Sequence, residues 1–172
     1  MNDWFSPALH RRLNQNRAAE MTDDEFDRLW RNLVERSHRS GRAPLSEQEQ
    51  HFYSVNLLRG AVPRSGFIGY FENSKSSEIA DAKEGLREMK LDAVLSVLEE
   101  AQATVFGDTI LPNDSTQLEI FPQSLTEEEY EDASDRLDER LTSIEEKLYE
   151  HEDEVWAALI AYADRHRLEP RG

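Results

Sequence analysis

Apolar residues recur every three or four positions along most of the chain, which is the spacing typical of amphipathic helices. Three stretches begin with a hydroxyl residue followed three positions later by Glu, the capping-box pattern that opens a helix. These pairs are Thr22 with Glu25, Ser46 with Glu49, and Thr126 with Glu129. Ser6-Pro7 also has the pattern of a helix start, for a short helix to about Asn16. The pattern therefore predicts a helix from each of these four positions.

The helix from Ser46 is expected to end at Gly60, because glycine is common just beyond the end of a helix. The elements expected next are a turn at 63–66, an aromatic helix at 67–71, a helix capped by Ser76 and Ser77 that runs to about Met89, a helix at 91–105, and a loop at 107–122. The loop contains at most a short extended piece at 118–121. Since no segment alternates strongly enough for a sheet, the expected fold class is all-α, as a single compact helical domain.

The last segment carries the longest amphipathic pattern in the chain. Its apolar positions stay on one side of a helical wheel, and no Gly or Pro interrupts 123–169. These positions are Tyr130, Ala133, Leu137, Leu141, Ile144, Leu148, Val155, Leu159, Tyr162 and His166. The simplest interpretation is one long acidic amphipathic helix over 126–166, bent near 151–153. Two helices in the same phase are the alternative.

Charge is distributed unevenly along the 172 residues, which carry 36 acidic and 20 basic side chains for a net charge of -16. Residues 1–66 hold ten arginines and nine acids, whereas 124–154 hold fourteen acids and three bases, a net of -11. This contrast separates an Arg-rich N-terminal part of the chain from an acidic domain that follows it. The acidic domain would repel phosphates and anionic lipids, so neither nucleic acid nor a membrane is expected as a direct partner.

The acidic block has a charge spacing close to that of a polynucleotide. As one helix its 31 residues would span about 46 Å. That length gives one net charge per about 4 Å, against one per about 3.4 Å along a DNA strand. The candidate phosphate-mimicking residues are Glu127, Glu128, Glu131, Asp132, Asp135, Asp138, Glu139, Glu145 and Glu146. A solvated face without a partner and a binding surface for a basic protein are the two interpretations.

A motif over 45–106 adds a family resemblance. It comprises His51-Phe52-Tyr53-Ser54-Val55-Asn56-Leu57-Leu58, then Gly66-Phe67-Ile68-Gly69-Tyr70-Phe71-Glu72-Asn73-Ser74, then a helix with Ala80 and Ala82, and finally 95–106. These residues resemble the bacterial DNA-mimic protein family. The signature of that family is a tyrosine-containing helix with Asn, then Asn-Gly-Gly-Phe, an amide-aromatic-Phe step and Asn-Ser. Arg64-Ser65-Gly66 stands here in place of Asn-Gly-Gly, and Gly69 in place of the usual Gln. Because the resemblance leaves out the first 43 residues, it implies an Arg-rich helical extension at 1–43 and a DNA-mimic-like helical domain at 44–172.

The resemblance implies an acidic, all-helical protein that presents DNA-like charge to a DNA-binding protein. The expected function is therefore a non-enzymatic DNA mimic that competes with DNA for the binding surface of a basic partner, which would be a regulator, a nucleoid protein or a nuclease. The alternative is an immunity or anti-defence protein that neutralises one nuclease or toxin, with Trp4, Phe5 or Trp156 as hot-spot aromatics. The motif aromatics Phe67, Tyr70 and Phe71 are expected to lie in the core.

The sequence contains no motif for catalysis or for cofactor or metal binding. A phosphate-binding loop, a dinucleotide fingerprint and the common hydrolase motifs are absent, and the five histidines lack metal-ligand spacing. No catalytic residue, cofactor or metal is therefore expected, and a small enzyme with an unrecognised site is the third hypothesis. His51 is expected to be a partly buried helix residue. Without cysteine, a membrane-length apolar segment or a signal-peptide pattern, the expected location is cytoplasmic.

The arginines of the N-terminal extension have two interpretations. They are Arg11, Arg12, Arg17, Arg28, Arg31, Arg36, Arg39 and Arg42. They would either fold against the acidic helix and neutralise part of it, or pair with the acids of a second subunit in a homodimer. His151 lies among acids on the apolar stripe and is a candidate residue for such an interface.

Overall fold

The computed structural model describes residues 21–38, 44–109, 111–112 and 117–170. Within these ranges the chain forms six α-helices and no strand, which confirms the all-α fold class. The helices are α1 (Asp23–His38), α2 (Glu47–Asn73), α3 (Ser76–Glu88), α4 (Asp92–Phe106), α5 (Glu127–Tyr149) and α6 (Glu152–His166). None of these described helices combines the length and the apolar character needed to cross a bilayer.

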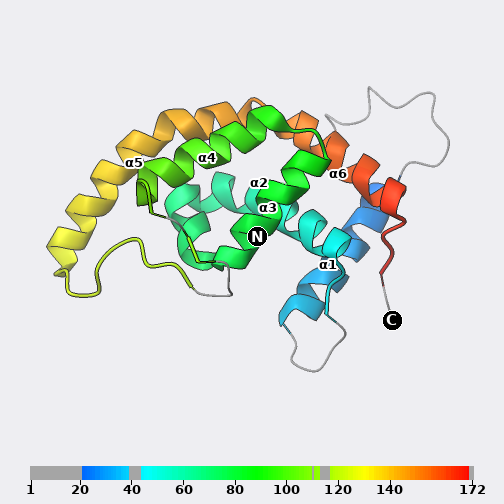
Figure 1. Cartoon of the computed structure of the whole chain (residues 1–172), viewed down its shortest axis with the longest axis horizontal. Coiled ribbons are helices and arrows are strands. Elements are labelled where there is room, and N and C mark those ends of the chain that lie inside the picture. Colours follow the sequence, from blue (N-terminus) through cyan, green and yellow to red (C-terminus); the bar gives the residue numbers. More distant parts are fainter. Residues whose placement is uncertain (1–20, 39–43, 110, 113–116, 171–172) are drawn as a thin grey trace.

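Helix α2 forms the centre of the fold, because α1, α3, α5 and α6 all contact it. Helix α4 contacts α3 and α5, and it runs beside α5 along one side of the molecule (Figure 1). The N-terminal end of α5 projects past the end of α4, and α6 brings the chain back to α1 (Figure 1). One long side of α5 consequently faces outward.

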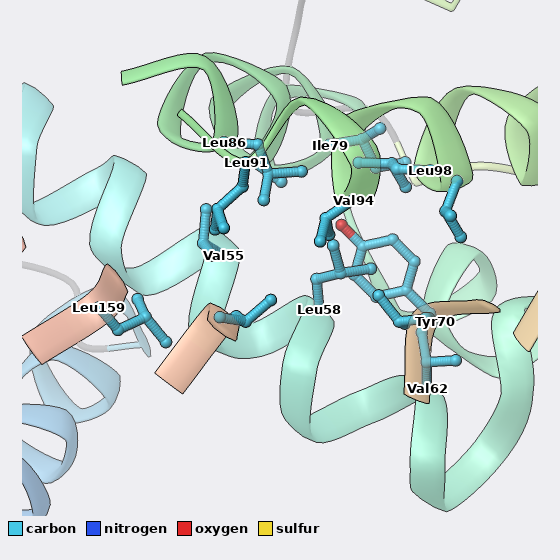
Figure 2. Close-up of a cluster of buried hydrophobic side chains, with 14 of the residues drawn as sticks. Val55, Leu58, Val62, Tyr70, Ile79, Leu86, Leu91, Val94, Leu98 and Leu159 are labelled. Atoms are coloured by element: carbon cyan, nitrogen blue, oxygen red, sulfur yellow. The ribbon is translucent and has the colours of Figure 1, made fainter. Parts of the chain in front are cut away.

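A single hydrophobic core continues from α1 to α6. In its centre Val55 of α2 faces Leu86 of α3 (Figure 2). Aromatic rings fill the part nearest α4, where Phe71 packs against Phe67 and Phe106 at centroid distances of 5.9 and 5.3 Å. The motif aromatics are 0–1% exposed, which confirms that they are core residues: Phe67, Tyr70 and Phe71.

The three predicted capping boxes form, so α1, α2 and α5 begin where the sequence predicted. In each box the Glu side chain accepts the backbone N–H of the cap residue, at 2.8 Å for Thr22, 2.7 Å for Ser46 and 2.9 Å for Thr126. Helix α3 differs, because Lys75 holds the N-cap position one residue before the predicted serines. Glu78 accepts its N–H at 2.8 Å and so completes the same backbone contact.

The prediction that Gly60 ends the helix that begins at Ser46 is wrong. Helix α2 continues through Gly60, and the non-helical residue inside it is Gly66, with φ 66° and ψ 179°. Val62 is 1% exposed, and burial of this part of the helix outweighs the cost of about 1 kcal/mol for a helical glycine. The break therefore falls at the end of the predicted turn at 63–66, and the aromatic helix expected at 67–71 forms the second part of α2.

The single helix expected over 126–166 is two helices, as the alternative interpretation had it. Glu150 and His151 separate α5 from α6 at the place where a bend was expected. The N–H of His151 bonds to the carbonyl of Leu148 at 3.0 Å, a tighter turn than an α-helix makes. The apolar stripe stays in phase across this turn, because both helices bury it against α2.

The loop after α4 contains no strand in its described residues. An isolated antiparallel bridge joins Gln117 to Lys75, and the Gln117 amide donates to the carbonyl of Glu72. The extended piece expected at 118–121 pairs with no neighbouring strand among the described residues. Its apolar side chains instead pack partly buried against the core.

Helix α1 is the described part of the Arg-rich extension. Its Phe26 packs against Phe52 of α2 and Trp156 of α6, at centroid distances of 5.3 and 4.3 Å. Leu29 is fully buried in the same core. The short helix predicted from Ser6 lies outside the described residues.

Candidate functional site

Most acidic residues of α5 lie on the side of the helix that faces away from the core. The buried stripe consists of Leu137, Leu141, Ile144 and Leu148. Because each residue turns the helix by about 100°, the candidate acids centre on a direction about 145° from that stripe. Eight of the nine candidates are exposed: Glu127, Glu128, Glu131, Asp132, Asp135, Asp138, Glu139 and Glu146. We call these eight residues the acidic surface.

Within the described part of the chain, no ion pair joins the acidic surface to Lys or Arg. Two bases of α5 are turned instead toward α4. Lys147 Nζ binds Glu100 at 2.8 Å, and Arg140 Nη2 donates to the carbonyl of Thr104 at 3.3 Å. The carboxylates of the acidic surface therefore remain open to an external partner.

The arginines of the N-terminal extension that the structure describes bind within α1 and α2. Arg36 Nη1 forms a buried ion pair with Glu49 of α2 at 2.7 Å. Arg28 and Arg31 each donate through Nε to a backbone carbonyl of their own helix. The other five arginines lie outside the described residues. Pairing of those five with the acidic helix, or with a second subunit, stays a prediction.

The acidic surface is shorter than an unbroken helix would have made it. The 23 residues of α5 span about 35 Å, compared with about 46 Å for the whole acidic block as one helix. From Glu127 to Glu146 the surface covers about 29 Å, so its eight carboxylates follow one another at about 4 Å on average along the helix axis. Phosphates follow one another at about 3.4 Å along a single DNA strand. The row therefore has the charge spacing of one strand rather than of a duplex.

The start of α5 is stabilised by its own acids, whereas the rest depends on packing. Glu129 accepts hydrogen bonds from the N–H and the hydroxyl of Thr126, both at 2.9 Å, and these bonds lower the pKa of Glu129. Carboxylates in the first turn also stabilise a helix, because they lie near the positive end of its dipole. Further along, like charges four residues apart, such as Asp135 and Glu139, cost about 0.2–0.5 kcal/mol per pair. The buried leucines must therefore hold this part of α5 in place.

A partly exposed tyrosine lies near each end of the acidic surface. Tyr130 and Tyr149 are 40% and 42% exposed. The Tyr130 ring packs edge-on against Phe121 at 5.0 Å, and its hydroxyl donates to Glu72 at 3.4 Å. Tyr130 thus lies at the margin of the apolar stripe to which the sequence assigned it.

Glu145 does not share the outward position of the other eight candidates. It is partly buried, and its Oε1 accepts the backbone N–H of Phe67 in α2 at 2.8 Å. Burial raises the pKa of Glu145, as does the neighbouring Asp138, while the Phe67 N–H lowers it. A helical wheel of α5 contains no information about α2, so it grouped Glu145 with the exposed carboxylates.

Two further candidates from the sequence, Trp156 and His151, have partners within this chain. The ring of Trp156 is partly buried, and the guanidinium of Arg59 lies 4.7 Å from its centre. His151 Nδ1 lies 2.9 Å from Glu154 at the start of α6. A role of Trp156 or His151 at an interface stays a prediction. Trp4 and Phe5 lie outside the described residues.

The structure also contains a partly buried polar cluster that the sequence did not predict. Tyr162 of α6 donates its hydroxyl to Glu88 of α3 at 2.6 Å, and His51 Nδ1 of α2 lies 3.1 Å from the same carboxylate oxygen. The Tyr162 hydrogen bond is the main reason that the pKa of Glu88 is lowered. His51 is more deeply buried than expected. Because these residues are 37 to 111 positions apart, no local sequence pattern indicates the cluster.

A groove of about 410 Å³ lies between α3, α4 and the loop that follows α4. Its charged residues include Lys83 and Arg87. Arg87 binds Glu84 at 2.6 Å and Glu99 at 3.4 Å, so its guanidinium is already paired within the chain. Among the described residues, no group of three or more His, Cys, Asp or Glu side chains is arranged to hold a metal ion.

The fold and this surface define a class of protein: an acidic helical domain in which one exposed helix side carries a row of carboxylates. The chain belongs to the DMP19-like protein family, whose model matches residues 43–166. The match covers α2 to α6 and includes the motif at 45–106, so it agrees with the family resemblance seen in the sequence. Comparison with curated proteins and with solved structures gave no match.

Proposed function

We propose that this protein is a non-enzymatic DNA mimic, whose acidic surface binds the DNA-binding surface of a basic protein and competes with DNA for it. The observation that carries the proposal is the row of eight exposed carboxylates on α5, none of which forms an ion pair with a described Lys or Arg. Membership of the DMP19-like family supports it through the resemblance of the motif at 45–106 to DNA-mimic proteins.

The arrangement of charge on α5 favours a basic partner over a merely solvated helix. Interspersed lysines would relieve the repulsion between acids four residues apart. Of the three bases of α5, Arg140 and Lys147 are directed at α4, and the exposed Arg136 forms no ion pair with the acidic surface in the described structure. A phosphate-binding surface offers Lys and Arg side chains, and binding it would remove this repulsion.

The test is displacement of DNA-binding proteins from DNA. Proteins from a lysate of the source cell are bound to immobilised duplex DNA, and the purified chain is then added at about 50 mM salt. The expected result is release of a distinct basic protein, identified by mass spectrometry. The affinity of the released protein for the purified chain, measured without DNA, should decline steeply toward about 300 mM salt, because salt screens exposed charges.

A matched pair of charge variants tests whether the acidic surface itself is responsible. Glu128→Gln, Asp132→Asn, Asp135→Asn and Glu139→Gln together remove four charges from α5. The control carries four equivalent changes at exposed acids elsewhere: Asp27→Asn, Asp92→Asn, Asp164→Asn and Glu169→Gln. We expect the first variant to bind the released protein at least about tenfold more weakly, a difference of about 1.4 kcal/mol. The control should bind like the unmodified chain.

The two variants have the same net charge, so equal weakening by both would refute the proposed surface. Far-UV circular dichroism must show that both retain the helix content of the unmodified chain. Direct binding of the released protein that is insensitive to salt would contradict the charge mechanism and favour the alternative of a specific immunity protein.

A further inference from the structure

Helix α2 is broken at Gly66, and its second part begins without a local capping side chain. The first N–H groups of a helical segment lack partners inside the helix and need an acceptor from elsewhere. At the starts of α2 and α5 the N-cap residues Ser46 and Thr126 supply it. At the break in α2 the acceptor is Glu145, 78 residues further along the chain, which takes the N–H of Phe67 at 2.8 Å.

The backbone at the break leaves room for this carboxylate only because residue 66 is glycine. Gly66 has a φ of 66°, a conformation that side chains with a Cβ adopt at a cost. A Cβ placed there would lie 2.8 Å from Glu145 Oε1, closer than such atoms normally approach, and 3.8 Å from Asp138 Oδ1. The break in α2 and the position of Glu145 on α5 are therefore fitted to each other.

Glu145 lies at a place on α5 where a contact can set the position of the whole helix. It is one residue before Glu146 of the acidic surface, and the helix between them and Glu127 is continuous. A hydrogen bond to a fixed backbone group restricts both the rotation of a helix about its axis and its shift along that axis. The leucine stripe alone is less directional, since hydrophobic contacts tolerate small rotations.

We propose that Glu145 is a positioning residue, which caps the second part of α2 at Phe67. This contact fixes the rotation of α5 about its axis and its shift along that axis, and so fixes where the acidic surface lies. The capping role does not depend on what the surface binds. Its consequence for binding rests on the proposed function. Glu145 is accordingly removed from the set of phosphate-mimicking residues.

Three single variants separate the effect of Glu145 on the position of α5 from the effect of its charge. Glu145→Gln removes the charge and keeps an oxygen acceptor, Glu145→Ala removes both, and Glu146→Ala removes an exposed neighbouring charge. Loss of a cap should lower the Tm of a chain of this size by about 2–4 °C. We expect that drop and faster hydrogen exchange at the Phe67 amide for Glu145→Ala, with neither change for the other two variants.

The position of α5 is measured directly with spin labels, which the absence of cysteine makes simple. Labels at Ala80→Cys on α3 and Ser143→Cys on α5 report the distance between the two helices. The distance distribution should broaden or shift in Glu145→Ala and stay unchanged in Glu145→Gln. Identical distributions in all variants would overturn the positioning role.

A double variant tests the fit between the two residues. Gly66→Ala should lower the Tm, because it introduces both the strained φ and the close contact with Glu145. The same change should cost less in the Glu145→Ala background, where the close contact is gone. Strictly additive Tm changes would contradict a direct Gly66–Glu145 fit.

The DNA-displacement assay then distinguishes the two proposals. If the acidic surface binds a partner and Glu145 only positions it, Glu145→Gln keeps displacement and Glu145→Ala weakens it. If both variants weaken displacement equally, Glu145 acts by its charge and the positioning role fails. If no variant displaces anything while the spin-label and exchange results hold, the proposed function fails and the positioning role stands.

Discussion

At the scale of single residues, two polar contacts join helices that are distant in the sequence. Arg36 of α1 binds Glu49 of α2 with both side chains buried, at 4% and 1% exposed. Tyr162 of α6 donates to Glu88 of α3 at 2.6 Å. A buried charge that loses its partner is costly, because neither water nor another group compensates for it. The Arg36–Glu49 pair therefore makes the packing of α1 on α2 sensitive to single substitutions, whereas the Glu88 carboxylate is 44% exposed and accessible to water.

Replacement of Arg36 should show this sensitivity. We expect Arg36→Leu to lower the free energy of unfolding by about 3 kcal/mol, because the Glu49 carboxylate stays buried without its partner guanidinium. The measurement is urea denaturation followed by circular dichroism. Arg28→Leu is the control, since Arg28 is exposed and should change stability by no more than about 0.5 kcal/mol. Equal midpoints for the two variants would contradict the prediction.

The hydrogen bond from Tyr162 predicts how acid affects stability. It lowers the pKa of Glu88 in the folded protein below the ordinary value of 4.5. The ionised carboxylate therefore contributes stability above that value, and the contribution is lost as the pH falls through the lowered pKa. Tyr162→Phe should make the Tm fall less steeply with pH in this range, as thermal melts at a series of pH values would show. An unchanged slope would mean that the hydrogen bond does not favour the ionised form.

At the scale of elements, α5 depends on its buried stripe and its N-terminal cap to overcome the repulsion along its exposed side. Four leucine and isoleucine side chains pack against α2 and α4. The cap at Thr126 satisfies the backbone N–H of Glu129, at an end that projects past α4 (Figure 1). The first turns of α5 consequently have fewer neighbours than the rest of the helix.

Loss of this cap should therefore loosen the helix locally. We expect Thr126→Ala to remove about 1 kcal/mol of helix stability and to speed hydrogen exchange over 127–131. Exchange over 137–148 should not change, because the buried stripe holds that part. Uniform acceleration along all of α5 would show instead that the helix opens as one unit.

At the scale of the whole molecule, the net charge of -16 opposes the compact state by self-repulsion. Much of that charge is concentrated on α5, where the described bases do not pair with the acidic surface. The same feature that is proposed to bind a basic partner therefore lowers the stability of the free protein. Stability and partner binding should respond to salt in opposite directions.

Salt should accordingly stabilise the protein on its own. Between about 0.01 and 0.15 M NaCl the Debye length falls from about 30 to 8 Å, which screens repulsion between neighbouring carboxylates. We expect the Tm to rise over this range in differential scanning fluorimetry. The rise should be smaller in the variant with four amides on α5 than in the control with four amides elsewhere. A Tm that falls with added NaCl would contradict this account.

Sequence patterns predicted the elements of the fold better than their connections. The capping pairs at Thr22, Ser46 and Thr126 located three helix starts, because a cap involves residues only three positions apart. Gly60 was misleading, since whether a glycine ends a helix depends on how its neighbours are buried. Of the candidate site, the sequence placed eight carboxylates on the exposed side of α5 and misplaced Glu145, whose position depends on α2.

The sequence by itself determined that this protein is helical, strongly acidic and charged along one side of the helix that begins at Thr126, because helix periodicity, capping and charge are properties of neighbouring residues. Only the tertiary structure decided where α2 breaks, where α5 gives way to α6, and which acid turns inward to Phe67. Those outcomes depend on contacts between residues far apart in the chain. Such contacts form only when the helices are packed against one another.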